Sequence, residues 1–464
     1  MSDFAADVDA HAAEYLAALR AYCRVACITG QGIGVRESAA ATADVLHGLG
    51  CEDVQVLATG GAPVVYGRIG HGRPTLLIYN HYDVQPPEPL EAWDSDPFAA
   101  EARDGKIFAR GVADNRGDVM ARVQAIASYR RVHGELPLTV KFVIEGEEEV
   151  GSPSLEAFVQ AHRDLLAADG CLWEGGALDE HGRFIVTLGL KGVLHAELRV
   201  RAARVDMHSS WATVVPSGPW RLVWALASLK DADDRITIDG LMDHVRPPSH
   251  EDLALLARIP FDEAAMLQDL QLPRFLRGLH GTDLLRKHLF EPTCTIQGLQ
   301  GGYAGPGLKA VLPTAAMAKI ELRLVPDLEP DLVLSLLRAH LDRRGFQDVE
   351  IVTHAKLSPA KAPADAPVVR STLAAARDCY GADPVVYPVM AASGPMSFFS
   401  AGLGVPVVTA GGLWWHDARA HAPNESIRVA DYMRGIRFIG ALLERFATQG
   451  SGGANGLQTS KPSD

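Results

Sequence analysis

Hydrophobic positions in the first part of the chain follow two rhythms that alternate with each other. Apolar residues recur at helical spacing over residues 5–28, 37–49 and 118–133. Between these stretches lie short, continuous apolar runs, and the clearest of them are 75–80 and 138–144. Such runs are typical of strands that are buried on both faces. The alternation predicts an α/β domain with a doubly wound, mostly parallel sheet that is covered by helices.

The rhythm changes after about Gly189. Residues 192–200 and 315–324 alternate between apolar and polar side chains, which predicts half-exposed antiparallel strands. Each of these strands is followed by a helical stretch, at 219–229 and at 332–343 respectively. The pattern therefore indicates a separate, compact α+β module.

The first rhythm resumes at about Leu357. We therefore predict one catalytic domain, formed by 1–188 and 357–449, that is interrupted by an inserted domain over 189–356. The remaining stretch, 450–464, is rich in Gly and Ser, and we expect it to be a disordered tail.

Composition and charge narrow the classes of protein that fit. A chain of 464 residues is long enough for two domains, and its 47% hydrophobic content allows a large core. The formal net charge of -13 disfavours a nucleic acid as partner, because binding a polyanion needs a basic face. The six cysteines are scattered without a Cys-x-x-Cys pair, as is typical of reduced thiols. The first residues lack the features of a signal peptide, and no apolar run reaches the ~18 residues of a membrane span. We therefore expect a cytoplasmic protein without membrane contact.

Histidine, aspartate and glutamate residues concentrate in five short segments. These segments are 81–86, 111–117, 145–152, 173–176 and 421–425. The first and the third directly follow the apolar runs that end at Asn80 and Ile144. Because sites in open α/β sheets form at the carboxyl ends of the strands, we expect the segments to come together in one site.

His81 and Asp83 have the spacing of a metal ligand and its supporting carboxylate. Residues two apart at the end of a strand point to the same side. Asp83 could therefore accept the free imidazole N–H of His81 and fix its tautomer. A lone histidine is more often structural, and the spacing alone leaves both interpretations open.

Three successive acids, Glu147, Glu148 and Glu149, follow the buried run 138–144. A run of acids is often a solvated loop. Directly beside a buried strand, however, crowded carboxylates are best tolerated when a cation lies among them. Adjacent side chains diverge, so one carboxylate could bind a metal while its neighbour faces a bound water. Metal-assisted hydrolysis requires this division between a ligand and a proton acceptor.

Other catalytic patterns have less support. The chain contains no Gly-x-Ser-x-Gly, and the segment that begins at His250 lacks the second histidine of His-Glu-x-x-His because position 254 is Ala254. The glycines of 30–34 do not match the dinucleotide-binding fingerprint, and they precede the first predicted strand instead of following it.

Taken in order, the acidic and histidine-containing segments resemble the motifs of the dinuclear zinc peptidase and deacylase family. The motifs are His81-x-Asp83, Gly111-x-x-Asp114-Asn115-x-Gly117, Glu148-Glu149-Val150-Gly151-Ser152 and His421-x-Pro423-Asn424-Glu425. The family includes carnosinase-type dipeptidases, bacterial carboxypeptidase G, acetylornithine deacetylase, succinyl-diaminopimelate desuccinylase and aminoacylase-1. The resemblance runs from about Gly30 to Phe446 and favours the dipeptidase-like branch.

The resemblance implies a site that binds two divalent metal ions. His81 and Glu174 would bind one ion, Glu149 and His421 would bind the other, and Asp114 would bridge the two. All of these ligand atoms are nitrogen or oxygen, which fits Zn²⁺ best and also allows Mn²⁺ or Co²⁺.

The resemblance also implies roles beside the ligands. Glu148 would be the general base that takes a proton from the metal-bridging water and delivers it to the leaving amine. Asp83 would orient the first histidine. The peptide bond between Asp114 and Asn115 is often cis in relatives, and Arg116 stands where many of them have Lys.

For the inserted region, the resemblance implies a ferredoxin-like lid and dimerisation domain. His208 matches a histidine that reaches the active site of the partner subunit and stabilises the developing oxyanion, so a homodimer is expected. Arg323 matches an arginine that grips a substrate carboxylate, a task that suits its planar fork. Ser393 and Gly394 resemble a loop that contacts the substrate.

These expectations combine into a metal-dependent hydrolase that cleaves the amide bond of dipeptides or short peptides with a free carboxylate. An N-acyl or N-carbamoyl amino acid amidohydrolase would use the same site, so this alternative stays open. A non-catalytic scaffold or ligand-binding protein is the alternative of another class. The complete ligand set together with Glu148 disfavours it.

Overall fold

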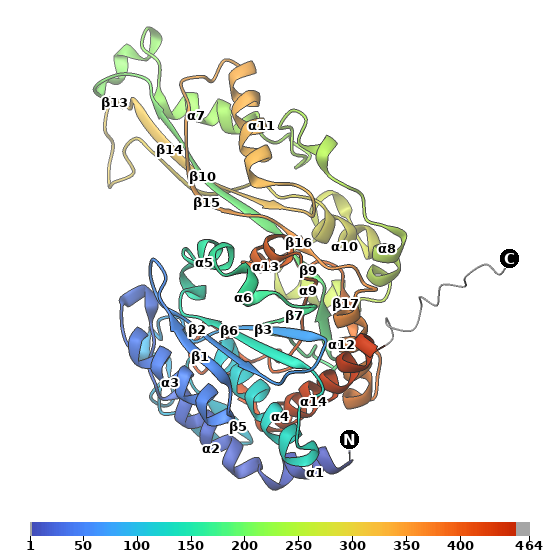
Figure 1. Ribbon diagram of the computed structural model, residues 1–464. Helices are drawn as coiled ribbons and strands as arrows, with labels where there is room; N and C mark the ends of the chain where they lie inside the picture. Colours follow the sequence, from blue (N-terminus) through green and yellow to red (C-terminus); the bar gives the residue numbers. More distant parts are fainter. Residues whose placement is uncertain (1, 452–464) are drawn as a thin grey trace, which may run out of the picture. The chain divides into compact units, whose positions relative to one another are not determined.

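The computed structural model describes residues 2–451, and these form two compact units (Figure 1). The first unit comprises the chain up to Gly189, Lys361–Pro388 and the chain from Phe398 onward. The second comprises Leu190–Ala360 and Val389–Ser397. Of the predicted disordered tail, 452–464 lies outside the described residues, whereas its first two residues are still part of the last helix.

The first unit contains most of the helices and a large sheet. Its helices are α1 (Ser2–Ala10), α2 (Ala12–Cys23), α3 (Val35–Leu49), α4 (Gly117–His133), α5 (Leu155–Ala161), α6 (Arg163–Leu166), α12 (Pro367–Tyr380), α14 (Val429–Ser451) and most of α13 (Met396–Leu403). The main sheet contains β1 (Glu52–Leu57), β2 (Val64–Ile69), β3 (Thr75–His81), β6 (Thr139–Glu145), β7 (Gly170–Trp173), β8 (Ile185–Thr187), β17 (Val385–Tyr387) and β18 (Val407–Thr409). A small sheet contains β4 (Glu101–Arg103), β5 (Lys106–Phe108) and β19 (Ser426–Arg428).

The main sheet has the strand order β1-β2-β6-β3-β7-β18-β8-β17. Its central strands β6, β3, β7 and β18 are parallel, whereas the pairs β1–β2, β2–β6 and β18–β8 are antiparallel. The prediction of an α/β fold with a mostly parallel sheet is confirmed. Because parallel strands present their carboxyl ends at the same edge, the residues that follow β3, β6 and β7 lie along one edge of the sheet.

Helix α4 is buried on nearly all sides, with α14 and α1 packed against it. Its sequence therefore has no polar stripe, yet it includes the buried charged residues Asp118 and Arg122. A buried charge is costly unless it is paired or hydrogen-bonded. The partners of Arg122 are strand ends of the main sheet, and they connect this helix to the candidate site described below.

The single helix predicted over 5–28 is wrong, because the structure has two helices, α1 and α2, that meet at His11. The backbone leaves the helical region at this residue, with φ −101° and ψ 8°. Further along, the buried guanidinium of Arg116 donates hydrogen bonds to the carbonyl oxygens of Tyr22, at 3.1 Å, and Val25. Arg116 thereby holds the chain at the end of α2.

The second unit is an α+β module. Its strands are β10 (Gly192–Arg201), β11 (Met207–His208), β12 (Thr295–Gly301), β13 (Val311–Leu312), β14 (Ala315–Leu324) and β15 (Glu350–Leu357). Its helices are α7 (Gly218–Ala227), α8 (His250–Leu256), α9 (Glu263–Asp269), α10 (Gly281–Phe290) and α11 (Pro330–Arg343). Strands β9 (Gly189–Leu190) and β16 (Ala360–Lys361) pair with each other where the chain passes from one unit to the other.

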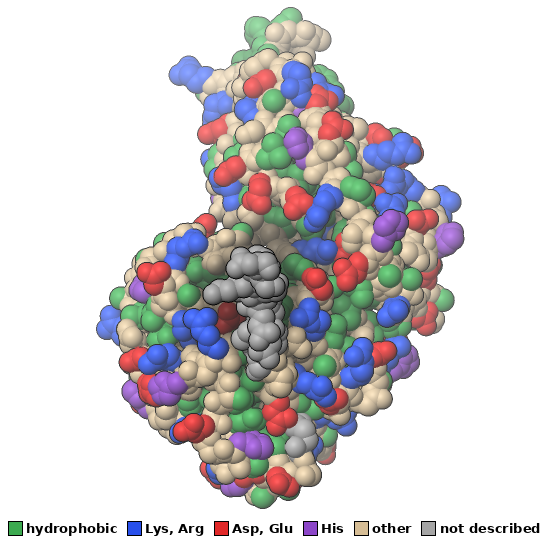
Figure 2. Space-filling view, turned by 45° about the vertical axis from the view of Figure 1, so that its right-hand side comes forward, with side chains coloured by type: hydrophobic (Ala, Val, Ile, Leu, Met, Phe, Trp, Pro, Cys, Tyr) green, Lys and Arg blue, Asp and Glu red, His purple; other side chains and the backbone are tan. Residues whose placement is uncertain are grey.

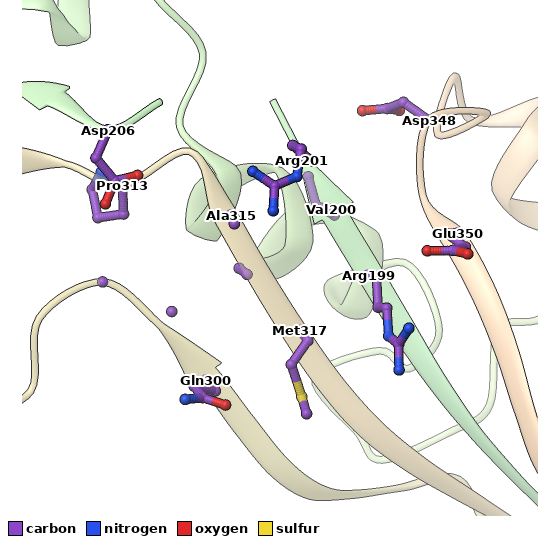
Figure 3. A pocket seen from close by; sticks show the side chains of 13 residues that line it. Arg199, Val200, Arg201, Asp206, Gln300, Pro313, Ala315, Met317, Asp348 and Glu350 are labelled. Carbon is purple, nitrogen blue, oxygen red and sulfur yellow. The ribbon is translucent and has the colours of Figure 1, made fainter. Parts of the chain in front are cut away.

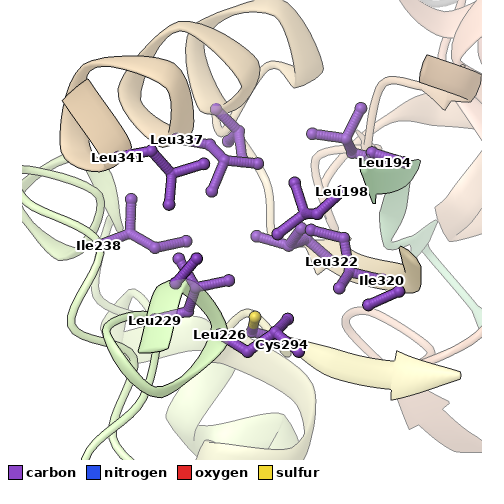
Figure 4. Packing of buried hydrophobic residues seen from close by; sticks show 14 of the residues in the cluster. Leu194, Leu198, Leu226, Leu229, Ile238, Cys294, Ile320, Leu322, Leu337 and Leu341 are labelled. Carbon is purple, nitrogen blue, oxygen red and sulfur yellow. The ribbon is translucent and has the colours of Figure 1, made fainter. Parts of the chain in front are cut away.

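A four-stranded antiparallel sheet of order β12-β14-β10-β15 organises the second unit. Leu194, Leu198 and Leu322 from its strands pack with Leu337 and Leu341 from α11 in one apolar cluster (Figure 4). The residues between them along each strand point to the other face of the sheet. The alternating pattern in the sequence thus corresponds to one covered face and one polar face.

Three global properties bear on function. Among the described residues, every helix falls short of the length or the apolar content that a bilayer span requires. All six cysteines are unpaired thiols, as their scattered spacing predicted. On the face shown in Figure 2, basic side chains are intermixed with acidic ones, so this face offers no continuous basic surface to a polyanion.

Candidate metal centre

Parallel strands of the first unit end beside one another and bring acidic and imidazole side chains to one edge. Strand β3 ends at His81, which pairs with Glu145 at the end of β6. Strand β7 ends at Trp173, so Glu174 is the next residue. After β6, the helical turn 148–150 carries two further acids. The edge of the sheet therefore gathers a histidine and several carboxylates.

Two loops complete the site. Asp114 lies in the helical turn before α4, and its peptide bond to Asn115 is cis. Gly111, which precedes this turn, has φ +82°, and a Cβ atom there would lie 2.2 Å from Val84 Cγ1. This position therefore requires glycine. The second loop joins β18 to β19 and carries His421.

Asp114 lies between two histidines and offers one oxygen to each. Its Oδ1 lies 3.0 Å from His81 Nε2, and its Oδ2 lies 3.0 Å from His421 Nε2. Glu174 Oε2 lies 3.4 Å from the same His81 nitrogen, and Glu149 Oε2 lies 3.2 Å from the same His421 nitrogen. Ligand atoms of His81, Asp114 and Glu149 all lie within 4.8 Å of one another. The five side chains thus form two groups of nitrogen and oxygen atoms that share Asp114.

The donor atoms fit divalent cations. Within the described residues, the buried oxygens Glu149 Oε1 and Glu174 Oε2 have no hydrogen-bond partner. Burial raises the pKa of Glu174 well above its ordinary value. Buried carboxylates without partners are costly unless a cation compensates them. Imidazole and carboxylate are also ligands that divalent transition metals accept. The residues present therefore fit a pair of metal ions.

Protons take part in the balance of charge at this site. Burial alone would lower the pKa of His81, but the carboxylates of Glu174 and Asp114 raise it well above its ordinary value. Hydrogen bonds to Asp114 and Glu149 raise the pKa of His421 to about 10. Burial would raise the pKa of Asp114, but hydrogen bonds from the two histidines hold it below its ordinary value. Both imidazoles must lose a proton to bind a metal, so metal binding competes with protonation.

Glu148 lies beside the five ligand residues, but it takes part in none of the contacts between them that are described above. Burial raises its pKa to about 7; His81 opposes this rise, whereas Asp114 and Glu149 add to it. A carboxylate whose pKa lies near neutrality is suited to accept a proton and to return it.

Asp83 connects the two ligand groups, and Gln85 supports one of them. His81 Nδ1 lies 3.0 Å from the backbone carbonyl oxygen of Asp83 and 3.4 Å from its Oδ1. Asp83 Oδ2 accepts a hydrogen bond from the backbone N–H of Glu149 at 3.1 Å, and Gln85 Nε2 donates to Glu149 Oε2 at 2.9 Å. The sequence predicted the Asp83 carboxylate beside His81, but it did not indicate the nearer backbone carbonyl or the role of Gln85.

Arg122 of α4 joins the ends of β3 and β7. The side chain is fully buried. Its Nη1 donates to the carbonyl oxygen of Tyr79 at 2.8 Å and to Asn80 Oδ1 at 2.7 Å, and its Nη2 donates to the carbonyl oxygen of Trp173 at 2.6 Å. Asn80 directly precedes His81, and Trp173 directly precedes Glu174, so Arg122 holds both strand ends in place. No sequence signal marked this residue, because most of its acceptors are backbone atoms.

Glu425 anchors the turn that carries Asp114. Its Oε2 accepts hydrogen bonds from Arg110 Nη1 at 2.7 Å and from the Gly111 N–H at 2.8 Å. Its Oε1 accepts from the N–H groups of Ala113 at 2.8 Å and of Asp114 at 3.0 Å. Because Glu425 belongs to the loop of the second histidine, it ties that loop to the turn. The sequence motif included Glu425 but gave it no role.

The remaining predicted site residues lie in the second unit. His208 is exposed, and its Nδ1 accepts the backbone N–H of Ser210 at 3.2 Å. Arg323 lies on β14. Ser393, which is followed by Gly394, donates from its Oγ to the carbonyl oxygen of Gly192 at 3.1 Å. The structure thus brings the six residues with proposed metal or base roles together in the first unit, and the roles of these four stay predictions.

The second unit also has a hollow of about 700 Å³ on the polar face of its sheet (Figure 3). Arg199 and Arg201 extend into it from β10, and Met317 lies on β14 beside them. Asp206 at its edge accepts hydrogen bonds from Thr314. No group of metal-ligand or nucleophilic side chains gathers among the described residues that line it. The chemistry of the molecule therefore centres on the metal-ligand cluster of the first unit.

A mostly parallel α/β unit with this cluster at its strand ends defines a metal-dependent hydrolase. Peptidase family M20/M25/M40 matches residues 77–445. A solved structure of an M20 family metallo-carboxypeptidase from Sulfolobus solfataricus is 35% identical, with a TM-score of 0.87 over 94% of this chain and 99% of that one. The Beta-Ala-His dipeptidase of Rattus norvegicus is 28% identical over 333 residues, which are 69% of this chain and 67% of that protein. The Cys-Gly metallodipeptidase of Schizosaccharomyces pombe is 27% identical over 301 residues, which are 61% of this chain and 60% of that protein.

The chain belongs to peptidase family M20/M25/M40. The resemblance that the sequence motifs indicated is confirmed, and so is the prediction of a metallopeptidase.

Proposed function

We propose that this protein is a dinuclear metallopeptidase that hydrolyses dipeptides or short peptides with a free carboxylate. The observation that carries the proposal is the convergence of His81, Asp114, Glu149, Glu174 and His421 around shared ligand positions, with Glu148 beside them. Two of the relatives described above are dipeptidases by name, and this supports the choice of dipeptides.

The two ligand groups support a specific assignment. His81 and Glu174 would hold one ion, His421 and Glu149 would hold the other, and Asp114 would be shared between the two groups. Zn²⁺ is the first choice for such a set, and Mn²⁺ or Co²⁺ are alternatives. When bound, the two ions would polarise the scissile carbonyl and lower the pKa of a shared water.

The protein's own residues then handle the protons. Glu148 accepts the proton of the attacking water and returns it to the leaving amine, for which a pKa of about 7 is well placed. Asp83 and Arg122 hold His81 in position, through its Nδ1 and through the end of its strand. Glu425 keeps the Asp114 turn in place through hydrogen bonds from its backbone N–H groups.

The second unit is proposed to be a ferredoxin-like lid and dimerisation domain. Without the short strands β11 and β13 and the helices α8, α9 and α10, the chain order is β10-α7-β12-β14-α11-β15. This order and the sheet order β12-β14-β10-β15 support the ferredoxin-like architecture. The bonds of His208 support its proposed role in the site of the partner subunit. Its Nδ1 accepts the Ser210 N–H, which leaves the ring proton on Nε2, free to donate to an oxyanion.

Exposed apolar residues of the second unit support the proposed homodimer. Trp220 and Trp224 stack on α7 with ring centroids 5.7 Å apart and are 60% and 56% exposed. Ile296 and Leu299 on the edge strand β12 are also more than half exposed. A second copy that covered this edge would remove these side chains from water. We also propose a cytoplasmic location, which the unpaired cysteines support.

The test is a set of matched substrates offered to protein loaded separately with Zn²⁺, Mn²⁺ or Co²⁺. Dipeptides, dipeptide amides, N-acyl amino acids and N-carbamoyl amino acids are compared by kcat/KM. We expect two ions per chain and the highest kcat/KM with free dipeptides. If kcat/KM is highest with the N-acyl or N-carbamoyl substrates, the protein is an amidohydrolase and the proposed peptidase function is wrong. Full metal loading without turnover of any substrate would favour a ligand-binding scaffold.

A further inference from the structure

The backbone of Arg323 forms two hydrogen bonds with Thr293, which is distant in sequence. Its N–H donates to Thr293 Oγ1 at 3.0 Å, and its carbonyl oxygen accepts the N–H of Thr293 at 3.0 Å. This pair of hydrogen bonds fixes the end of β14. The side chain is 31% exposed, so the guanidinium remains accessible to a ligand.

The guanidinium is held through one edge by Glu321, two residues earlier on β14. Arg323 Nε donates to Glu321 Oε1 at 3.0 Å, and Arg323 Nη2 donates to Glu321 Oε2 at 3.0 Å. None of the described residues accepts a hydrogen bond from Nη1. A guanidinium has five N–H groups, so three remain for another acceptor, and two of these lie parallel along the edge formed by Nη1 and Nη2.

Glu321 is itself held from both neighbouring strands. It lies opposite His195 on β10, whose Nε2 is 3.3 Å from Glu321 Oε2. Gln297 on β12 donates from Nε2 to the same oxygen at 3.1 Å. The residue is only 8% exposed. The Glu321 carboxylate therefore has little conformational freedom. Because it fixes the orientation of the Arg323 guanidinium plane, that plane has little freedom either.

We infer that Glu321 is a positioning residue for substrate selection, which aims the free Nη1–Nη2 edge of Arg323 at the carboxylate of a peptide substrate. The inference rests on the proposed function, in which Arg323 binds that carboxylate. An arginine that is already ordered loses less conformational entropy on binding. The fork of two parallel N–H groups also matches a carboxylate only when the plane is correctly oriented.

Glu321 could in principle act in the opposite way, as a competitor that repels the substrate. The geometry favours positioning, because Glu321 occupies the Nε–Nη2 edge and leaves the Nη1–Nη2 edge open. The positive guanidinium would then lie between the two carboxylates and attract both. The two alternatives predict changes of KM in opposite directions.

The experiment compares a dipeptide with its C-terminal carboxamide in the metal-loaded wild-type protein and in Glu321→Gln. The amide side chain keeps the shape but brings N–H groups opposite a donor of Arg323. We expect KM for the free dipeptide to rise about 3- to 10-fold, the effect of freeing one side chain. We expect kcat to change less than about two-fold, and KM for the carboxamide to stay at its wild-type value.

The chain offers a matched control on β10. Glu197 precedes Arg199 by two residues, accepts from its Nε at 2.8 Å and is only 5% exposed. Glu197→Gln therefore breaks a pair of the same kind in the same sheet. It should leave the KM values of both substrates unchanged. Glu321→Asp, which keeps the charge, should retain more of the preference for the free dipeptide than Glu321→Gln.

Arg323→Ala separates failure of the inference from failure of the proposed function. If Arg323 binds the carboxylate, this variant loses about 10- to 100-fold of the preference for the free dipeptide. Adding Glu321→Gln to it should then change nothing further. If Arg323→Ala keeps the preference, the carboxylate role in the proposed function is wrong. If Arg323→Ala loses it while Glu321→Gln lowers KM or leaves it unchanged, only the inference is overturned.

Discussion

The two halves of the candidate metal centre are built in different ways. The strand half, His81 and Glu174, follows the ends of buried strands, and the His81 side chain is 0% exposed. The loop half, His421 and Glu149, lies on a loop and a short turn, and the His421 side chain is 50% exposed. The strand half takes its geometry from the core of the unit. The loop half depends on a few local hydrogen bonds.

This difference shows where each half is vulnerable. Arg122 lies inside α4, so the strand half shares its support with the hydrophobic core. Glu425 lies on the His421 loop of the loop half and accepts hydrogen bonds mainly from backbone N–H groups of the turn that carries the shared Asp114. A change at Arg122 should therefore cost stability, whereas a change at Glu425 should mainly cost metal affinity.

The largest effect is expected at Glu148, which serves both halves together. Glu148→Gln removes the proton acceptor and keeps the shape, so kcat should fall by about 10²- to 10⁴-fold while two ions remain bound. Steady-state kinetics and metal analysis of the same preparation check this. The neighbouring Glu147→Gln is the matched control, and it should keep wild-type kcat. Equal losses in the two variants would contradict the assignment of the base.

Arg122→Met tests the strand half. The substitution leaves two backbone carbonyls and Asn80 Oδ1 without a donor inside the core, which should lower the free energy of unfolding by roughly 3–5 kcal/mol. Chemical denaturation of the metal-free protein measures it. Arg131→Met, on an exposed part of the same helix, removes an ion pair with Asp7 and should cost no more than about 1 kcal/mol. Similar costs at both positions would remove the distinction between the halves.

Glu425→Gln tests the loop half. Two N–H donors of the turn would then face an amide N–H₂ group, so affinity for the ion of the loop half should fall about 10- to 100-fold. Competition with a chromogenic chelator measures both ions separately. Glu444→Gln on α14 is the matched control and should bind both ions as the wild type does. If both ions weaken equally in Glu425→Gln, Glu425 supports the whole centre and not one half.

The smallest effect is expected from pH. The pKa of His421 is about 10 in the folded, metal-free protein and about 6.5 in an unfolded chain. Its protonation therefore stabilises the metal-free protein fully below about pH 6.5, and this contribution is lost as pH rises through about 10. Metal must displace the same proton, so the stabilisation by metal should grow over this window. The gap in Tm between loaded and metal-free protein should widen from about pH 6.5 to 8.5, and a constant gap would contradict the competition.

The sequence predicted the strand half better than the loop half. The end of an apolar run places His81 at the edge of the sheet without any relative, because the sheet brings strand ends together. His421 lies on a loop of no periodicity, where its segment stood out only by composition, and the family motif gave it a role as ligand. Arg122 and Gln85 were missed because their partners in space are distant in sequence. The same reason explains why residues 389–397 lie with the second unit, although the pattern placed them with the first.

The chain passes between the two units four times, after Gly189, Ala360, Pro388 and Ser397. During synthesis from the N-terminus, all residues of the second unit are made before the ribosome reaches β18, which belongs in the main sheet between β7 and β8. The nascent first unit must therefore wait with an unfilled place in its sheet until this late strand arrives. His421 and Glu425 emerge later still, so the complete set of metal ligands exists only after most of the polypeptide has been made.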